Sequence, residues 1–406
     1  MKTVWIINHY AEPPEVGKYL RHFNFARKLK EKYKVKIFTA STVHNTDVNI
    51  IEDGKSYVEK TIDGVDFVFI KTSQYFGNSY ARIKNMFDYY FGVQKVTKNF
   101  GSCDIVYSSS PHSLTWLAAR KIAKRYGAKF IAETRDLWPL TFIEMGRMTR
   151  GSIPARILFK IEKSIYKSAD RLIFTIPGGY KYVEDLGLDS SKCSYINNFI
   201  DLDEFDYNAK NKIYDGKEYN EDKSFKVVFT GALGKANNLM ELLRAAKYLK
   251  SMGEDDIRIY LFGYGAEEEN LRAFKEENSL DNVHFMGKVK KEVVPNILVK
   301  SDLNIITLNH IPGLFKYGLS PNKIFEYFAA KKPILMNVKS GFDLVEKYQA
   351  GKSVDGKSEK ELAEAILEFK NMNHSDYEKY ANNARKASHD FELDKLTEKL
   401  IDVFEN

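Results

Sequence analysis

Short apolar and β-branched runs alternate along the chain with longer segments whose apolar residues recur every three or four positions. In the first half these runs are Val4–Asn8, Val35–Ala40, Val65–Ile70, Ile105–Ser109, Lys129–Glu133 and Arg171–Ile176. Helical spacing follows the first run at Tyr19, Phe23 and Ala26, and a second helix is expected over Leu114–Tyr126. Strands separated by helices of this length predict βαβ units and a parallel sheet.

The second half repeats the alternation. The expected strands are Lys226–Thr230, Ile257–Phe262, Val283–Met286, Leu303–Thr307 and Pro333–Asn337, and the expected helices are Leu239–Met252, Glu267–Asn278, Lys291–Lys300 and Asn322–Ala330. The polar segment Asn197–Asp222 between the halves is expected to be an irregular linker, and the tail Ser375–Glu405 an amphipathic helix. The pattern predicts two α/β domains with doubly wound parallel sheets and a ligand cleft at the carboxyl ends of the strands.

The expected domain boundaries follow from this pattern. Residues 1–198 form the first domain, 199–222 the linker or hinge, and 223–385 the second domain. Residues 386–406 form a C-terminal helix expected to pack back on the first domain. A chain of 406 residues is long enough for two such domains, each with its own core.

Composition excludes several classes of protein. With 44% apolar and 29% charged residues, the chain is neither extensively disordered nor collagen-like. Its two cysteines support neither a disulfide framework nor a zinc site. No run approaches 18 apolar residues, and the apolar stretch after Met1 is too short for a signal peptide. A cytosolic protein is therefore expected.

Charge is unevenly distributed between the halves. Residues 1–200 carry a net charge of +12 and the remainder −5, which gives the overall +7. Such a split favours a polyanionic or membrane-surface partner for the first half. The alternative is a solvated lysine-rich surface without a specific partner.

Two glycine turns follow strands in the second half. Gly231-Ala232-Leu233-Gly234-Lys235 joins a strand to a helix, where backbone N–H groups can approach an anion and Lys235 can neutralise a diphosphate. Gly263-Tyr264-Gly265 ends the next strand, but a lone Gly-x-Gly is more often a plain turn.

The most informative stretch is Tyr317-Gly318-Leu319-Ser320-Pro321-Asn322-Lys323-Ile324-Phe325-Glu326-Tyr327. Ser320 or Pro321 can cap a helix that begins near Asn322, and its free N–H groups favour an anion. Glu326 lies about one turn into the helix, where a carboxylate can accept hydrogen bonds from a ribose diol. A capped core helix with a solvated glutamate is the alternative.

Together these motifs resemble the family 4 glycosyltransferases of the GT-B fold. The stretch from Gly318 through Ile334 is similar to their donor-site signature, closest to the branch of O-antigen and capsular polysaccharide enzymes that includes L-fucosamine transferases. The turns after the strands and three further segments also resemble that family: His9–Gly17, Glu133-Thr134-Arg135-Asp136-Leu137-Trp138-Pro139, and Asn197–Asp201. The resemblance covers nearly the whole chain.

The resemblance implies a retaining, metal-independent transferase without a cofactor, whose co-substrate is a nucleotide diphosphate sugar, expected to be UDP-linked. The resemblance implies that Glu326 binds the ribose hydroxyls of the nucleotide. The donor-binding positions are Gly17, Gly231, Lys235, Gly263, Gly318, Leu319, Ser320, Lys323 and Glu326. The acceptor, lipid-linked through undecaprenyl diphosphate or a glycan in surface polysaccharide synthesis, belongs to the first domain.

The chain departs from the family pattern at three positions. Gly318 stands where the family often has a second glutamate, so the carboxylate contact to the donor sugar is missing. Ala232 replaces an arginine, which leaves phosphate neutralisation to Lys235, with Lys323 or Arg135 as further candidates. Asn198 replaces the hinge glycine and tolerates a left-handed backbone.

Retaining transfer depends on stabilising the leaving phosphate and on orientation. Asp136 is the expected acceptor-side catalytic residue, with Lys235 and His112 as the other catalytic candidates; His9, Arg135 and Trp138 are expected to bind the acceptor. The alternatives are an ion pair between Asp136 and Arg135 and an ordinary loop position for each histidine. Asp201-Leu202-Asp203 mimics a metal motif, but its place in the linker predicts hinge structure and no metal.

The segment Tyr80–Phe100 is a candidate for binding a membrane surface. Ile83, Met86, Phe87, Tyr90 and Phe91 share one helical face, flanked by Arg82, Lys84, Lys95 and Lys98. Packing into the core is the more usual role of such a face. A basic amphipathic helix can instead lie in a lipid interface, which would make the protein peripheral at the inner face of the cell membrane.

Two other functions fit part of the pattern. A non-hydrolysing nucleotide-sugar epimerase shares the two-sheet plan but needs a carboxylate beside the sugar, which Gly318 does not supply. A non-catalytic nucleotide-sugar-binding subunit would keep Glu326 and Lys235 without a role for Asp136. Nucleic-acid binding is disfavoured because no RNA or DNA motif occurs.

Overall fold

The computed structural model describes residues 1–16, 20–44, 46–52, 54–77, 79–110, 112–356 and 358–406. The chain divides into two compact units, which are described separately. The first unit contains Met1–Asn197 and Leu393–Asn406, and the second contains Asn198–Glu392.

The first unit is built on an eight-stranded sheet of order β3-β4-β2-β1-β5-β6-β7-β8, parallel except for the β3–β4 pair. The strands are β1 Thr3–Ile7, β2 Lys34–Ala40, β3 Tyr57–Ile62, β4 Val65–Ile70, β5 Ile105–Ser109, β6 Lys129–Thr134, β7 Arg171–Phe174 and β8 Cys193–Tyr195. Its helices are α1 Arg21–Leu29, α2 Tyr80–Val96, α3 Ser113–Tyr126, α4 Leu140–Glu144, α5 Ile153–Ser168, α6 Gly179–Asp185 and α17 Leu393–Glu405.

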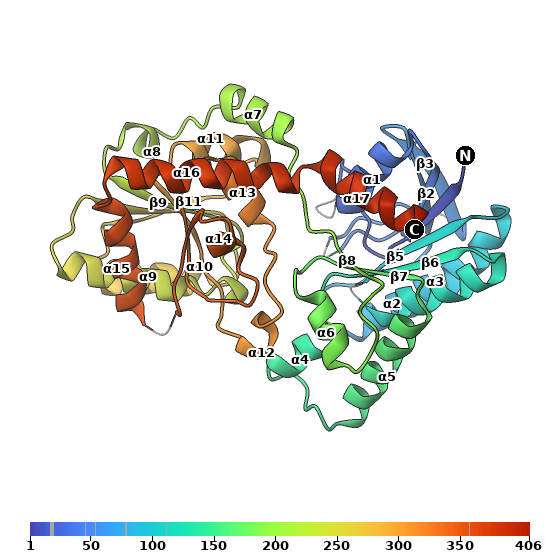
Figure 1. The fold of residues 1–406 in the computed structure, drawn as a ribbon. Coiled ribbons are helices and arrows are strands. Elements are labelled where there is room, and N and C mark those ends of the chain that lie inside the picture. Colours follow the sequence, from blue (N-terminus) through green and yellow to red (C-terminus); the bar gives the residue numbers. More distant parts are fainter. Residues whose placement is uncertain (17–19, 45, 53, 78, 111, 357) are drawn as a thin grey trace. The chain divides into compact units, whose positions relative to one another are not determined.

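Helices α2, α3 and α5 form a continuous layer on one face of this sheet, and α1 pairs with α17 on the other (Figure 1). Helix α3 is central: Lys121 donates to the Tyr90 hydroxyl of α2 at 2.6 Å, and Arg120 donates to Ser164 of α5 at 2.8 Å. The cationic side chains of these three helices are Arg82, Lys84, Lys95, Arg120, Lys121, Lys124, Arg125, Arg156, Lys160, Lys163 and Lys167, and their carboxylates are Asp88 and Glu162. We call this group the cationic layer. Much of the positive charge of the first half lies here.

The second unit has a six-stranded, wholly parallel sheet of order β11-β10-β9-β12-β13-β14. The strands are β9 Phe225–Thr230, β10 Ile257–Phe262, β11 Val283–Gly287, β12 Leu303–Ile306, β13 Ile334–Met336 and β14 Gly351–Ser353. Its helices are α7 Leu202–Asn211, α8 Lys217–Glu221, α9 Leu239–Ser251, α10 Glu268–Glu277, α11 Val294–Val299, α12 Pro312–Phe315, α13 Lys323–Ala329, α14 Leu344–Lys347, α15 Glu359–Lys370 and α16 His374–Ser388. Apolar clusters cover both faces of the sheet, as expected for a doubly wound domain.

The structure differs from the sequence expectation between the two sheets. Residues 199–222, expected as an irregular linker, contain α7 and α8 and belong to the second unit. Leu202, Phe205 and Tyr219 are buried there and give the polar stretch an apolar anchor. The side chain of Asp201 accepts the Glu204 N–H at 3.0 Å and caps α7, which is a structural role for the Asp-Leu-Asp motif.

The tail also differs from a single helix. A 3₁₀ turn at His389–Phe391 separates α16 from α17, and the boundary between the units falls there. Helix α17 packs in the first unit, where Phe404 lies edge-on to Tyr33 at 5.6 Å and Lys129 donates to the Val403 carbonyl at 2.9 Å.

Candidate functional site

The two glycine turns of the second unit lie against each other at the carboxyl ends of the adjacent strands β9 and β10. The Leu233 N–H donates to the Tyr264 carbonyl at 3.0 Å, and a Cβ on Gly263 would meet the Gly231 oxygen at 1.7 Å. Gly263 also has φ +148°, so both its space and its backbone require glycine. Gly263 is thus needed for packing between the turns, whereas Gly231 is exposed.

Asn309, which follows β12, fixes the backbone of the turn that contains Lys235. The side-chain amide of Asn309 donates to the Lys235 carbonyl at 2.7 Å, and its backbone N–H donates to the Ala236 carbonyl at 3.2 Å. Lys235 itself is exposed, and among the described residues its ammonium has no hydrogen-bond partner. The backbone is therefore fixed while the cation stays available to a ligand.

Lys323, the first residue of α13, points back to the Gly231 turn. Its Nζ lies 3.8 Å from the centre of the Phe229 ring, donates to the Asn237 side-chain oxygen at 3.2 Å, and would stand 3.0 Å from a Cβ on Gly231. Burial lowers the pKa of Lys323 to about 7, an effect opposed by the charge of Glu326. A partly neutral lysine beside an exposed glycine turn is suited to gain charge when an anion binds.

Glu326 lies one turn along α13 from Lys323 and is half-buried. Burial raises the pKa of Glu326, and Lys291 and Lys323 oppose that rise. Within the described part of the chain its carboxylate has no hydrogen-bond partner. Tyr327 anchors the helix, because its hydroxyl accepts the Thr230 N–H at 2.9 Å at the end of β9.

The segment before α13 enters it through a left-handed glycine. Gly318 is buried, has φ +95°, and donates its N–H to the Phe315 carbonyl at 2.9 Å. Leu319 and Ser320 are half-buried. The structure thus brings Gly231, Lys323 and Glu326 to the end of the second sheet where its strands have their carboxyl ends.

A histidine pair lies at the carboxyl ends of β1 and β5 in the first unit. His9 Nδ1 is 2.7 Å from His112 Nε2, and His9 Nε2 is 2.7 Å from the Asn85 oxygen. The Asn85 amide nitrogen donates to Thr42 Oγ1 at 2.9 Å and to the Ser73 carbonyl at 2.6 Å, so its oxygen can only accept. His9 therefore carries its proton on Nε2, and His112 donates through its own Nε2.

This proton assignment leaves His112 with a bare Nδ1. That atom is buried and has no partner among the described residues. Burial and the charge of Arg82 lower the pKa of His112 to about 3, so the ring is neutral at physiological pH. A buried lone acceptor is costly unless a ligand satisfies it.

Arg135, Asp136 and Trp138 follow β6, the next strand of the sheet. The Arg135 N–H donates to Ser110 Oγ at 3.3 Å, and its carbonyl accepts from Thr175 at 3.2 Å, which fixes the loop between the ends of β5 and β7. Asp136 is exposed, and in the described structure it forms no ion pair with Arg135. Trp138 is half-buried against Phe142, with ring centres 4.3 Å apart.

Gly17, the remaining predicted donor residue, lies outside the described residues. Sequence reasoning missed Asn85, which fixes both histidines. Its signal was available, since Asn85 is a polar residue in register with Tyr89 and Val93 on the buried side of α2.

A buried ion pair supports this edge of the first sheet. Arg21 donates to Glu133 Oε2 at 3.0 and 2.8 Å, and the same guanidinium donates to the carbonyl of Asn197 at 2.5 Å and that of Ile196 at 2.9 Å. Arg21 and His22 lower the pKa of Glu133 well below its usual value, against the effect of burial. The pair holds the point where the chain leaves the first unit.

Helix α2 exposes the apolar face that the sequence singled out. Ile83, Phe87 and Phe91 are 50%, 44% and 64% exposed, whereas Asn85 and Tyr89 face the core. Packing of this face into the core of its own unit is therefore excluded for these three residues. No helix among the described residues is long and apolar enough to cross a membrane.

Two family descriptions match successive parts of the chain. Glycosyltransferase Family 4 matches residues 22–204, and "Glycosyl transferases group 1" matches residues 211–387. Among curated proteins, the probable glycosyltransferase WbjE of Pseudomonas aeruginosa is 22% identical over 252 residues, which are 62% of this chain and 61% of that protein. The match thus spans about three fifths of that relative.

Solved structures resemble the chain over its whole length. Anabaena HepE in complex with UDP-glucose is 13% identical, covers 100% of both chains and has a TM-score of 0.70. Sucrose-phosphate synthase from Thermosynechococcus elongatus is 14% identical, with 100% and 98% covered and a TM-score of 0.73. At these identities the likeness shows the fold, which is GT-B. The chain thus has the GT-B fold, in which a region similar to Glycosyltransferase Family 4 precedes a region similar to glycosyl transferases group 1.

Proposed function

We propose that the protein transfers a hexosyl or N-acetylhexosaminyl group from a UDP-linked sugar to a lipid-linked or glycan acceptor in the synthesis of a bacterial surface polysaccharide, as in the branch that includes L-fucosamine transferases. The observation that carries the proposal is the Lys323 ammonium against the exposed Gly231 turn, with Glu326 one turn further along α13. The complex of HepE with UDP-glucose supports the donor, and the similarity to the probable glycosyltransferase WbjE supports the transfer reaction.

On the donor side, the proposed roles follow from charge and exposure. Lys235 and Lys323 supply positive charge to the diphosphate, and Gly231 lets the backbone approach it. The Glu326 carboxylate accepts hydrogen bonds from the ribose hydroxyls. Stabilisation of the departing UDP by these fixed cations is the main catalytic effect we assign to the second unit, and no metal is required.

On the acceptor side, His112 acts through its bare Nδ1. A neutral imidazole with a pKa of about 3 is a poor base, so it orients a sugar hydroxyl by accepting its hydrogen bond. Asp136, exposed and without an ion pair to Arg135, is the polar group that contacts the acceptor. Weak base power suits transfer with retention, in which the leaving phosphate itself assists the incoming hydroxyl.

The exposed face of α2 supports a peripheral position at the inner surface of the cell membrane. Phe87 and Phe91 can enter the lipid interface while Lys84 and Lys95 remain at the headgroups. Arg82 is a poor test residue, because its Nε lies 3.4 Å from the Tyr10 hydroxyl beside the histidine pair. The Phe87→Ser, Phe91→Ser double variant should bind neutral and acidic vesicles less well, and unchanged binding would exclude this contact.

The transfer proposal is tested with a panel of nucleotides and nucleotide sugars. UDP or a UDP-sugar should raise the apparent melting temperature, because ligands stabilise the state they bind. Glu326→Ala should weaken nucleotide binding, whereas Asp136→Ala should reduce transfer, or slow hydrolysis of the donor, with binding retained. Wild-type nucleotide affinity in Glu326→Ala, or full activity in Asp136→Ala, would overturn the respective role. Chelator-resistant activity and the anomeric configuration of the product test metal independence and retention.

A further inference from the structure

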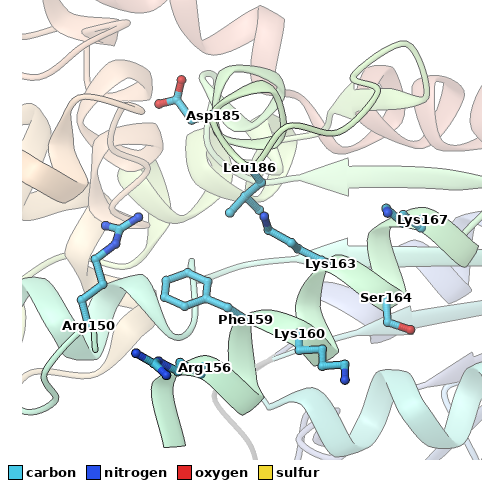
Figure 2. A pocket seen from close by; sticks show the side chains of 9 residues that line it. All are labelled: Arg150, Arg156, Phe159, Lys160, Lys163, Ser164, Lys167, Asp185 and Leu186. Carbon is cyan, nitrogen blue, oxygen red and sulfur yellow. The ribbon is translucent and has the colours of Figure 1, made fainter. Parts of the chain in front are cut away.

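A basic hollow lies between α5 and α6 in the first unit. Its volume is about 720 Å³. Its charged lining consists of Arg150, Arg156, Lys160, Lys163, Lys167 and Asp185 (Figure 2). We call it the α5–α6 hollow. Neither the donor site nor the histidine pair uses it.

Most cations of the α5–α6 hollow lack an ion-pair partner among the described residues. In the described part of the chain Arg156, Lys160, Lys163 and Lys167 form no ion pair. Arg150 lies over the Phe159 ring at 5.5 Å, which holds the guanidinium at the rim without cancelling its charge. Figure 2 shows the Asp185 carboxylate directed away from the lysines.

The carboxyl group of Glu162, close to the hollow, contributes little negative charge. Glu162 of α5 is fully buried, and the Tyr182 hydroxyl lies 3.0 and 2.9 Å from its two oxygens. Burial raises the pKa of Glu162 to about 8, so the group is largely neutral at pH 7. Several cations at close range repel one another, and such an arrangement is stabilised when an anion binds.

Apolar side chains stand exposed on the same helix. Ile153 and Ile157, one turn apart at the start of α5, are 73% and 53% exposed. Helix α5 is also continuous with the rest of the cationic layer, since Arg120 of α3 reaches Ser164 in the lining of the hollow. A free phosphate would use the cations alone, whereas a bilayer offers acidic headgroups and an apolar interface together.

We propose that the α5–α6 hollow receives the phosphate headgroup of an acidic phospholipid, and that α5 docks on the bilayer with Ile153 and Ile157 in the interface. This contact is independent of the transfer reaction and of the apolar face of α2. It is electrostatic and needs acidic lipid, whereas the α2 contact also acts on neutral lipid.

The experiment measures partitioning onto phosphatidylcholine vesicles with and without phosphatidylglycerol. The test variant is Arg156→Gln, Lys160→Gln, Lys163→Gln, Lys167→Gln. The matched control, Arg244→Gln, Lys247→Gln, Lys379→Gln, Lys386→Gln, removes the same charge from exposed positions of the second unit. UDP is present throughout to fill the donor site, and thermal unfolding checks that each variant is folded.

A lysine or arginine near an acidic surface contributes roughly a fivefold gain in partitioning. The test variant should therefore lose more than tenfold of its binding to acidic vesicles, and the control much less. The wild-type advantage should fall as salt is added. The Ile153→Ser, Ile157→Ser double variant should weaken the vesicle binding that persists at high salt.

Equal losses in the test and control variants would overturn the proposal, as would no loss in either. Inorganic pyrophosphate is the competing probe. If it stabilises the UDP-loaded wild type but not the test variant, while acidic vesicles bind both alike, the hollow takes a free anion and the lipid assignment is wrong. Failure of wild type to bind UDP would count against the proposed transfer reaction alone.

Discussion

Nucleotide binding should depend on pH through Lys323. In the free protein the pKa of Lys323 is about 7, because its ammonium is buried against Phe229 and the Gly231 turn. About half of the molecules carry the charge at pH 7, and about 3% do so at pH 8.5. A bound diphosphate would raise the pKa again, so binding takes up a proton.

The size of the effect follows from these populations. If the charged lysine is the form that binds, UDP affinity falls about fifteenfold between pH 7 and pH 8.5, or about 1.6 kcal/mol. The sign is fixed by the direction of the pKa shift, because affinity is lost as pH rises through the pKa of the free protein. Calorimetry in buffers of different ionisation enthalpy should show uptake of about half a proton at pH 7 and nearly one at pH 8.5.

Two variants isolate the lysine. Lys323→Arg keeps its charge across this range, so its affinity should be nearly flat and reports any titration of the nucleotide itself. Lys323→Met removes the charge and should weaken UDP binding about tenfold or more at pH 7. The reasoning is refuted if wild type and Lys323→Arg share one pH profile and one proton count, or if Lys323→Met binds UDP normally.

Three other substitutions test other parts of the structure. Gly263→Ala should lower stability by several kcal/mol in urea unfolding, because its Cβ would meet the Gly231 oxygen at 1.7 Å; a wild-type midpoint would contradict this contact. Glu133→Gln should lower it by about 3–5 kcal/mol by leaving the Arg21 charge buried. The pKa of Glu133 is lower in the folded protein than its value of 4.5 in the unfolded chain. The stability difference between wild type and Glu133→Gln should therefore be full above pH 4.5 and should disappear as pH falls. A stability difference that does not change with pH would argue against the ion pair. His112→Phe should reduce transfer with donor affinity retained, and unchanged transfer would remove His112 from the acceptor site.

Much of the site could be located from the sequence because its signals are local. The strands β4, β5 and β10 coincide with apolar runs, and the turns after them must lie at the carboxyl edge of a parallel sheet. Gly231 was found in this way, whereas Lys323 and Glu326 were assigned from the start of a predicted helix and from the family resemblance. The short strand β14 has no comparable pattern, because three residues are too few to show a period.

Helix α2 shows where periodicity becomes insufficient. One stripe, Ile83, Phe87 and Phe91, and another, Asn85, Tyr89 and Val93, have the same spacing on opposite sides of the helix. Both contain aromatic or aliphatic residues, so spacing alone cannot choose the side that faces the sheet. The fold decides it, since Asn85 finds Thr42, Ser73 and His9 as partners.

The sequence by itself determined the two-sheet plan, the glycine turns and the excess of positive charge in the first half. Only the tertiary structure decided that Gly263 serves packing, that Lys323 loses much of its charge, and that the cations of α5 line a hollow. The reason is physical: strand and helix periods are set by neighbouring residues, whereas burial, proton affinity and uncompensated charge depend on side chains that the fold brings together from distant positions.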